Sequence, residues 1–232
     1  MELGEARILV AGATGTLGGL FARALGSEGA RLALAGRDTE RLNPLAEELD
    51  ALALSFDARD TGSCREAVDQ AATQLGGLDA VFITSGLAGF GEASSLGEEA
   101  ARELFEVNVL GPIAIVGAAL ERLEPKGAIV GISAIVADYP TAGMAAYSAT
   151  KAALSAYLSA VRRERRRQGL TVLDVRPQHM ETGFSDRAVA GEPPPLPDPI
   201  DPDDLVSMVL EAVREGKREI AFDISAKELV VR

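Results

Sequence analysis

The stretch RILVAGATGTLGG, residues 7–19, decides the fold of this chain. Its first five residues form a short apolar run that predicts a buried strand, and apolar residues with helical spacing come after the stretch. Glycines stand at positions 12, 15 and 18 between the two. Glycine lets the backbone turn tightly and approach a ligand closely, and the start of the next helix offers free N–H groups to a pyrophosphate. A plain structural turn is the alternative, but a position between the first strand and a helix favours a dinucleotide site.

Strand and helix patterns alternate along the rest of the chain, with no break in composition. This alternation predicts an α/β fold with one doubly wound parallel sheet and a single domain over residues 1–232. Residues 178–200 lack a clear period and hold five prolines, so we expect a lid, a binding loop or a disordered segment there. The predicted strands after the first are residues 31–35, 51–56, 79–84, 126–133, 170–175 and 218–222, and the predicted helices include 41–49, 63–75, 98–123 and 202–215.

The second predicted strand ends at Gly36, and Arg37 follows it. An acidic residue at this tip would bind the ribose 2′-hydroxyl of NAD, whereas a nearby arginine suits the 2′-phosphate of NADP. The alternative is that Arg37 only pairs with Asp38 or a neighbouring glutamate. We therefore expect NADP(H) to be favoured over NAD(H).

Polar or turn-forming residues follow the other predicted strands, at the edge of the sheet where ligands bind. Asp57 could accept a hydrogen bond from an adenine amino group or could cap a helix nearby. Ser85 and Gly86 form a turn that could lie under the nicotinamide ribose. Ser133 and Pro177 end the fifth and sixth strands. This convergence is the main argument for a nucleotide site.

Tyr147 and Lys151 stand four residues apart among strong helix formers, so a helix would place both on one face. An ammonium beside a phenol favours the phenolate and would bring its pKa from about 10 toward neutrality, which suits a proton donor or acceptor. An incidental pair on an amphipathic helix is the alternative. Asn108 lies within a predicted long apolar helix, just before Gly111-Pro112. An asparagine there costs stability unless its amide is hydrogen-bonded, so either a functional or a structural role is open for it.

Together these motifs resemble the short-chain dehydrogenase/reductase family over essentially the full chain, which implies a Rossmann-like fold. The resemblance implies hydride transfer to or from NAD(P) and assembly into homodimers or homotetramers through the long helices. It makes Tyr147 the catalytic acid/base, Lys151 the residue that lowers its pKa and holds the nicotinamide ribose, and Asn108 the holder of a water in the proton relay. The cofactor residues that it implies are Gly12, Thr14, Gly15, Thr16, Leu17, Gly18, Arg37, Asp57, Ala58, Ser85, Gly86, Tyr147, Lys151, Pro177 and Thr182.

Three features depart from the family pattern. The glycine spacing is one residue shorter than in the main branch, and residues 83–86 read Ile-Thr-Ser-Gly where the family has Asn-Asn-Ala-Gly. The serine that orients the substrate usually lies thirteen residues before the tyrosine, and that position is Ala134, with Ser133 one step earlier. Neighbouring side chains on a strand point to opposite faces, so Ser133 serves the substrate only if the following loop shifts the register.

Composition narrows the classes of function. The formal net charge of −12 argues against nucleic acid or an anionic membrane as partner, and the basic run at residues 162–167 reads as the solvated end of a helix. We expect no segment that spans a bilayer and no signal peptide. Cys64 is the only cysteine and His179 the only histidine, which argues against a metal site and favours a cytoplasmic setting.

The leading hypothesis is an NADP(H)-dependent oxidoreductase that acts on a small, apolar carbonyl or alcohol substrate. The alternative is a nucleotide-binding regulatory or interaction protein with weak or lost catalysis, which Ala134 and the altered turn at Ser85 would suit. We expect His179 to be a loop residue near the cofactor and not a catalytic one. Residues placed to line an apolar substrate pocket are Leu87, Phe90, Val136, Tyr139, Met180 and Phe184.

Overall fold

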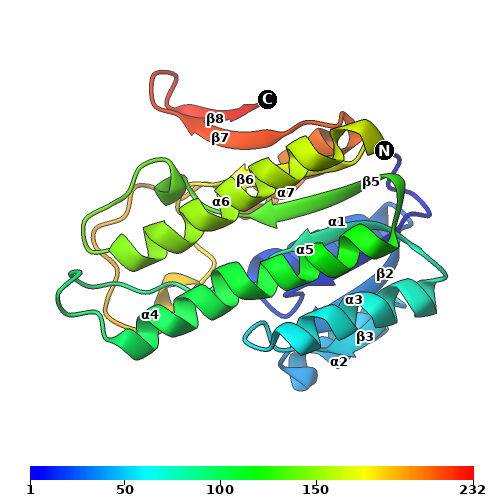
Figure 1. Ribbon diagram of the computed structural model, residues 1–232, viewed down its shortest axis with the longest axis horizontal. Coiled ribbons are helices and arrows are strands. Elements are labelled where there is room, and N and C mark those ends of the chain that lie inside the picture. Colours follow the sequence, from blue (N-terminus) through cyan, green and yellow to red (C-terminus); the bar gives the residue numbers. More distant parts are fainter.

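Eight strands form one sheet in the computed structural model, which describes residues 1–232 (Figure 1). The strand order is β3-β2-β1-β4-β5-β6-β7-β8, with β1 to β7 parallel and β8 antiparallel to β7. The strands are β1 Arg7–Ala11, β2 Arg31–Gly36, β3 Leu52–Ser55, β4 Leu78–Ile83, β5 Leu123–Ile132, β6 Thr171–Arg176, β7 Glu219–Asp223 and β8 Glu228–Val231. The helices are α1 Thr16–Ser27, α2 Thr39–Glu48, α3 Thr61–Leu75, α4 Glu98–Phe105, α5 Gly111–Arg122, α6 Ala145–Arg165 and α7 Pro202–Arg214.

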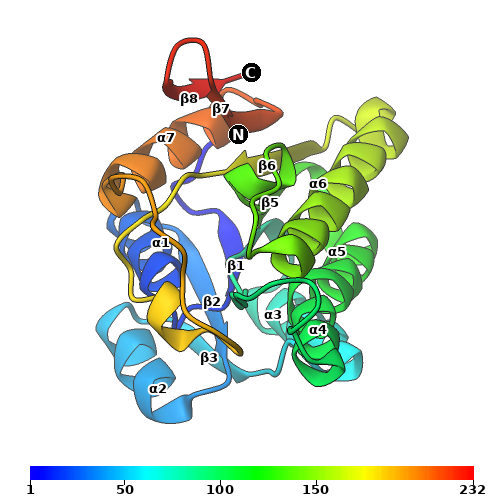
Figure 2. The same ribbon diagram turned by 90° about the vertical axis from the view of Figure 1, so that its left-hand side faces the viewer.

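Helices cover both faces of the sheet, as the predicted doubly wound fold requires (Figure 2). On β1, Ile8 and Val10 pack in one core with α1, α2 and α7, whereas Leu9 and Ala11 pack in a second core with α3, α5 and α6. Side chains alternate between the faces of a strand, so a strand covered on both sides must be apolar at every position. This explains why the predicted strands read as continuous apolar runs.

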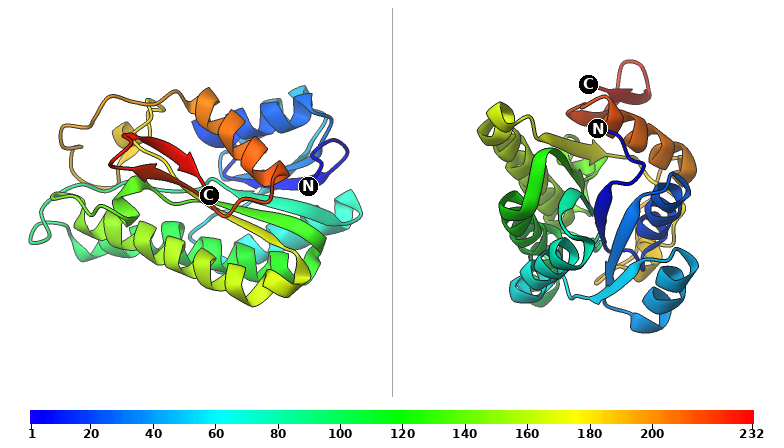
Figure 3. Two further views of the ribbon diagram at one scale, coloured as in Figure 1. Left: turned by 90° about the horizontal axis from the view of Figure 1, so that it is seen from above. Right: turned by 90° about the vertical axis from the view of Figure 1, so that its right-hand side faces the viewer.

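The C-terminal hairpin extends the sheet beyond the predicted strands (Figure 3). The last predicted strand corresponds to β7, and β8 adds an antiparallel edge in which Ile220 pairs with Val231. β8 was missed because it is a run of only four residues that is largely exposed, so it carries no clear burial pattern.

The predicted helix over residues 98–123 is divided into α4, a π-helical turn at Glu106–Leu110, and α5. Pro112 has no N–H, so it cannot donate the usual helical hydrogen bond to the carbonyl of Asn108. The N–H of Gly111 instead reaches the carbonyl of Glu106, five residues back. Such turns occur mostly at functional sites, and this one holds Asn108.

The helical segment Glu98–Arg122 is long and apolar enough to cross a membrane, judged by length and composition only. The sequence had been predicted to contain no such segment. Most of its apolar window is buried inside the protein, so this one helix is weak evidence for a membrane span.

The basic run at the end of α6 is not entirely solvated, in contrast to the prediction. The guanidinium of Arg162 donates to the backbone carbonyls of Val172 and Arg218 and so ties α6 to the edge of the sheet.

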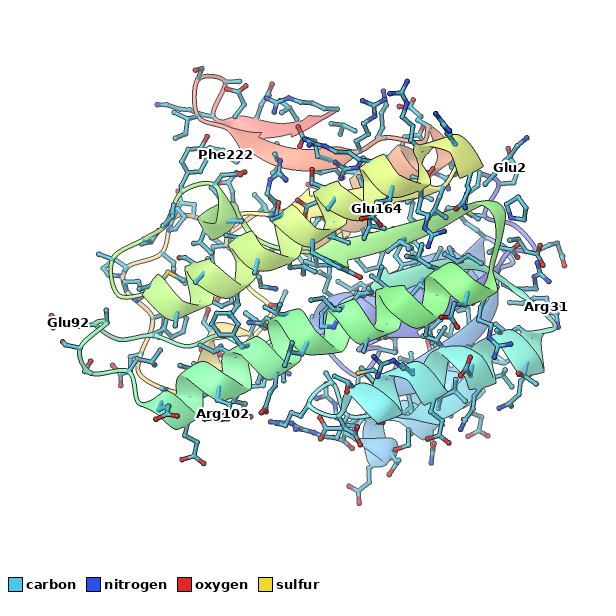
Figure 4. All side chains as sticks on the ribbon, viewed as in Figure 1. Glu2, Arg31, Glu92, Arg102, Glu164 and Phe222 are labelled. Atoms are coloured by element: carbon cyan, nitrogen blue, oxygen red, sulfur yellow. The ribbon has the colours of Figure 1, made fainter.

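The loop over residues 178–200 closes against the segment that follows β4. Val189 donates a backbone hydrogen bond to Ala88, and Phe90 donates one to Ala190. In Figure 2 this loop crosses in front of the carboxyl ends of the strands. Figure 4 shows that Arg31, at the start of β2, and Glu92, just beyond this pairing, lie at opposite ends of the molecule.

Candidate active site

A cavity of about 740 Å³ opens at the carboxyl ends of the parallel strands. Segments that follow β1, β2, β3, β4, β5 and β6 form its wall together with the start of α6, which is where ligands bind in sheets of this topology. All predicted cofactor residues line it: Gly12, Thr14, Gly15, Thr16, Leu17, Gly18, Arg37, Asp57, Ala58, Ser85, Gly86, Tyr147, Lys151, Pro177 and Thr182.

The glycine turn between β1 and α1 is packed so tightly that side chains would not fit. Gly12 has φ +98°, and a Cβ there would lie 2.6 Å from the backbone nitrogen of Ser85. A Cβ on Gly18 would collide with the carbonyl oxygen of Gly12. Gly15 precedes α1 and no side chain caps this helix start, so its backbone N–H groups remain free to bind an anion.

An acidic residue at the tip of β2, where it would bind the ribose of NAD, would crowd the side chain of Thr14. A Cβ on Gly36 would lie 2.6 Å from Cγ2 of Thr14. Asp38, two residues on, accepts hydrogen bonds from the backbone N–H groups of Glu40 and Arg41 and so caps α2. The side chain of Arg37 forms no ion pair with Asp38 or with a glutamate, so the predicted alternative does not hold.

Arg37 and Arg41 present two cations to the cavity, one on each side of the start of α2. Neither guanidinium is in an ion pair, whereas nearby Arg23 on α1 is paired with Glu48 at 2.8 Å. Arg41 was not among the predicted residues; it lies in the first turn of α2, and no motif in the sequence marks it.

Asp57 contributes a carboxylate at the end of β3. Its Oδ1 accepts a hydrogen bond from the N–H of Arg59 at 3.0 Å. The predicted alternative of helix capping belongs instead to Asp60, which accepts from the N–H groups of Gly62 and Ser63. Arg59 also pairs with Glu103 on α4 at the wall of the cavity, a contact that the sequence did not reveal.

Tyr147 and Lys151 lie on the buried face of α6, at 7% and 3% exposure. The ammonium of Lys151 lies 5.7 Å from the centre of the Tyr147 ring and donates to the carbonyl of Ile132 at 3.0 Å. Burial raises the pKa of the Tyr147 phenol and lowers the pKa of Lys151 to about 8. The sequence predicted the opposite direction for Tyr147. The direction differs because desolvation of the phenol outweighs the ammonium, which is directed to a backbone carbonyl.

Asn108 is completely buried in the π-helical turn and connects three segments. Its Oδ1 accepts from the N–H of Leu87 at 2.8 Å, and its Nδ2 donates to the carbonyl of Leu87 and to Oγ1 of Thr150. The amide therefore fixes the segment after β4 to α6, one residue from Lys151. Unlike the other predicted site residues, Asn108 does not line the cavity.

Ser133 does not present its hydroxyl to the substrate side of the cavity. Its Oγ donates to Asp174 and to the carbonyl of Val175 on β6. The next residue, Ala134, has extended backbone and packs in one apolar cluster with Tyr147. The loop after β5 therefore does not shift the register, and the position that faces Tyr147 carries a methyl group instead of a hydroxyl.

The remaining wall of the cavity is largely apolar. The ring of Phe184 lies 6.4 Å from that of Tyr147, and His179 is part of the wall, as expected for a loop residue near the cofactor. The predicted pocket residues Leu87, Phe90, Val136, Tyr139, Met180 and Phe184 all line the cavity. Other lining residues that were not predicted include Gln178, Arg187, Pro194, Pro195, Leu196 and Pro197.

Comparison with known proteins gives a consistent result. A family model described as short chain dehydrogenase matches residues 6–193. An uncharacterized oxidoreductase of Myxococcus xanthus is 28% identical over 95% of this chain and 88% of its own length. Dehydrogenase/reductase SDR family member 7B of Danio rerio is 28% identical over 93% of this chain and 76% of its own length.

Solved structures share the fold over nearly the whole chain. A short chain dehydrogenase from Burkholderia cenocepacia, crystallised with NADP, superposes with a TM-score of 0.85 at 27% identity and covers 96% of this chain and 98% of its own. An alcohol dehydrogenase from Thermococcus sibiricus, complexed with 5-hydroxy-NADP, gives 0.83 at 25% identity over 93% and 94%. The chain belongs to the short-chain dehydrogenase/reductase family, and it is an oxidoreductase with a nucleotide-cofactor site.

Proposed function

We propose that this enzyme transfers hydride between NADP(H) and a small, largely apolar carbonyl or alcohol, with Tyr147 as the proton donor or acceptor. One observation carries the proposal: the phenol oxygen of Tyr147 has no hydrogen-bond partner in the protein and lies at the apolar part of a cavity that also holds the glycine turn. A buried hydroxyl is normally satisfied, so a free one in a cavity is available to a substrate.

The residues of the cavity fit the cofactor. The free N–H groups at the start of α1 suit the pyrophosphate, and Arg37 and Arg41 suit a 2′-phosphate. Asp57 suits the adenine amino group, and Lys151 suits the nicotinamide ribose. Oγ of Ser85 is buried beside the glycine turn without a partner, as expected of a site that a polar ligand completes. When bound, the nicotinamide supplies or accepts the hydride.

In the direction of reduction, Tyr147 gives its proton to the substrate oxygen. Its raised pKa keeps the proton on the phenol at neutral pH, which is the form that a donor requires. Lys151 is protonated below its pKa of about 8 and stabilises the phenolate that remains. Activity that depends on this charge is therefore present at neutral pH and declines as the pH rises through about 8.

Substituting Arg37 by Ala is expected to weaken NADPH binding by about 10–100-fold and to leave NADH binding unchanged. The reason is the loss of a charge-assisted hydrogen bond to the 2′-phosphate, worth roughly 1.5–3 kcal/mol. Calorimetric titration with both cofactors measures the effect. Arg31→Ala is the matched control, because Arg31 is also exposed but lies at the opposite end of β2. NADH binding as tightly as NADPH to the wild type would overturn the NADP assignment.

A cofactor-binding protein with weak catalysis is the second candidate, and Ala134 is the observation that favours it. Oxidation of NADPH by the pure protein over a panel of apolar ketones and aldehydes separates the two functions. Tight NADPH binding with no oxidation across the panel would favour the second.

We also propose that the chain self-associates through its long helices. Phe105 on α4 and Leu110 in the π-helical turn are 40% and 48% exposed and lie within one continuous helical segment, so a partner helix packed there would cover both. Leu110→Glu is expected to convert a dimer or tetramer to smaller species in sedimentation velocity. Arg31→Ala, an exposed residue on the side of the molecule away from α4 (Figure 4), should leave the assembly unchanged. A wild type that sediments as a monomer would contradict the proposal.

A further inference from the structure

A buried ionic network lies directly behind Lys151, on the side away from the cavity. Asp174 and Arg176 are 1% and 8% exposed, and both side chains, which come from β6, form hydrogen bonds with Ser155 on α6. Arg176 forms ion pairs with Asp174, with Asp138 after β5 at 2.7 Å, and with Glu219 on β7 at 2.7 Å. Burial of charge is costly unless every member is paired, so an arrangement of this kind needs an explanation.

Asp174 connects the two elements that hold Lys151. Its Oδ1 accepts from Ser133, the residue after Ile132, and the carbonyl of Ile132 is the acceptor for the Lys151 ammonium. Its Oδ2 accepts from Ser155 at 2.6 Å, and Ser155 lies one turn after Lys151 on the same face of α6. One carboxylate thus binds β5 and α6 together on both sides of the lysine.

Asp174 also supplies negative charge near Lys151. It shares Arg176 with Asp138 and Glu219, and Glu219 has a second partner in Arg232 at 3.3 Å. Lys151 is buried with one backbone carbonyl as its only hydrogen-bond partner, which by itself does not compensate an ammonium removed from water. The charge of Asp174 acts on Lys151 and opposes the effect of burial.

We propose that Asp174 is a positioning residue for Lys151, which it serves by clamping β5 to α6 through Ser133 and Ser155 and by keeping the buried ammonium charged at neutral pH. Other charged groups packed near it are Arg176, Asp138, Glu219 and Arg162. The same contacts explain why Ser133 is present although it does not face the substrate. The titration of Lys151 does not depend on the proposed function. The expected effect on turnover does, because it requires Lys151 to act in the reaction as proposed.

Titration of the lysine side chain tests the inference directly. The chain has only four lysines, Lys126, Lys151, Lys217 and Lys227, so labelling with [ε-¹³C]lysine gives four resonances, and Lys151→Arg assigns one of them. We expect Lys151 to titrate near pH 8 in the wild type and at lower pH in Asp174→Asn. The sign follows from the loss of a negative charge that favours the charged amine.

Glu219→Gln is the matched control, because it removes a carboxylate from Arg176 but touches neither Ser133 nor Ser155. Its Lys151 resonance should shift much less than that of Asp174→Asn. Asp174→Asn moves the titration to lower pH, a sign that general loosening of the fold would not produce, because hydration of Lys151 raises its pKa. Arg176→Gln leaves Asp174 less compensated and should move the titration to higher pH, so its thermal stability is measured alongside to exclude loosening. With stability unchanged, it decides the matter if Asp174→Asn does not fold.

A folded Asp174→Asn protein that titrates as the wild type would overturn the inference, as would an equal shift in Glu219→Gln. The alkaline limb of the pH profile of kcat/KM should move with the resonance. If the resonance shifts and the limb does not, the inference on Asp174 stands and the role proposed for Lys151 in turnover fails.

Discussion

Replacing Tyr147 by Phe is expected to lower kcat/KM for carbonyl reduction by about 10²–10⁴-fold, the usual contribution of a positioned proton donor. The change removes one oxygen atom. That oxygen forms no hydrogen bond within the protein, and the ring stays in its apolar cluster with Phe184. The measurement is steady-state oxidation of NADPH with the best carbonyl found in a panel.

The same reasoning predicts what should not change. Because the phenol oxygen has no partner in the protein to lose, Tyr147→Phe should keep the thermal stability of the wild type. Tyr157→Phe, on the same helix and outside the cavity, controls for the loss of a phenol as such. Full activity in Tyr147→Phe would show that another group supplies the proton, and His179 on the cavity wall would be the next to test.

The fold was predictable because its signals are local and strong. Both faces of the sheet are covered, so each central strand is an apolar run, and glycine marks the tight turn that leads from β1 into α1. Asp201 followed by Pro202 predicted the start of α7, and its carboxylate does accept the N–H of Asp203. β8 escaped because an exposed strand of four residues depends on its pairing with β7 more than on its own sequence.

Motif spacing located the site, but its electrostatics depended on tertiary contacts. The pairing of Tyr147 with Lys151 suggested a lowered phenol pKa, yet the depth of burial and the carbonyl of Ile132 decide the direction. Asp174 has no motif and lies in an ordinary strand, so only the structure shows that it accepts hydrogen bonds from both β5 and α6.

Both the sequence and the structure place an alanine, Ala134, where the family has the serine that orients the substrate. This departure leads to the second prediction with a large expected effect. Ala134→Ser is expected to raise kcat/KM for ketone reduction by up to about 10²–10³-fold, the loss seen when one donor to a developing oxyanion is removed. A carbonyl oxygen can accept two hydrogen bonds, and Tyr147 supplies one. Ala134 belongs to the same apolar cluster as Tyr147 and, like Tyr147, lines the cavity.

Ala88→Ser is the control for Ala134→Ser. Ala88 belongs to the same apolar cluster and also lines the cavity, but it follows β4 and not β5. The variant therefore adds the same hydroxyl at a different position of the cavity wall. A gain confined to Ala134→Ser would mean that the wild-type site lacks only the second donor and that Tyr147 is already in place for a carbonyl. An equal response of both variants would mean that polarity of the cavity matters and position does not. A loss of activity in Ala134→Ser alone would instead indicate that the native substrate fills the space beside Ala134 with an apolar group, because a buried hydroxyl without a partner is unfavourable.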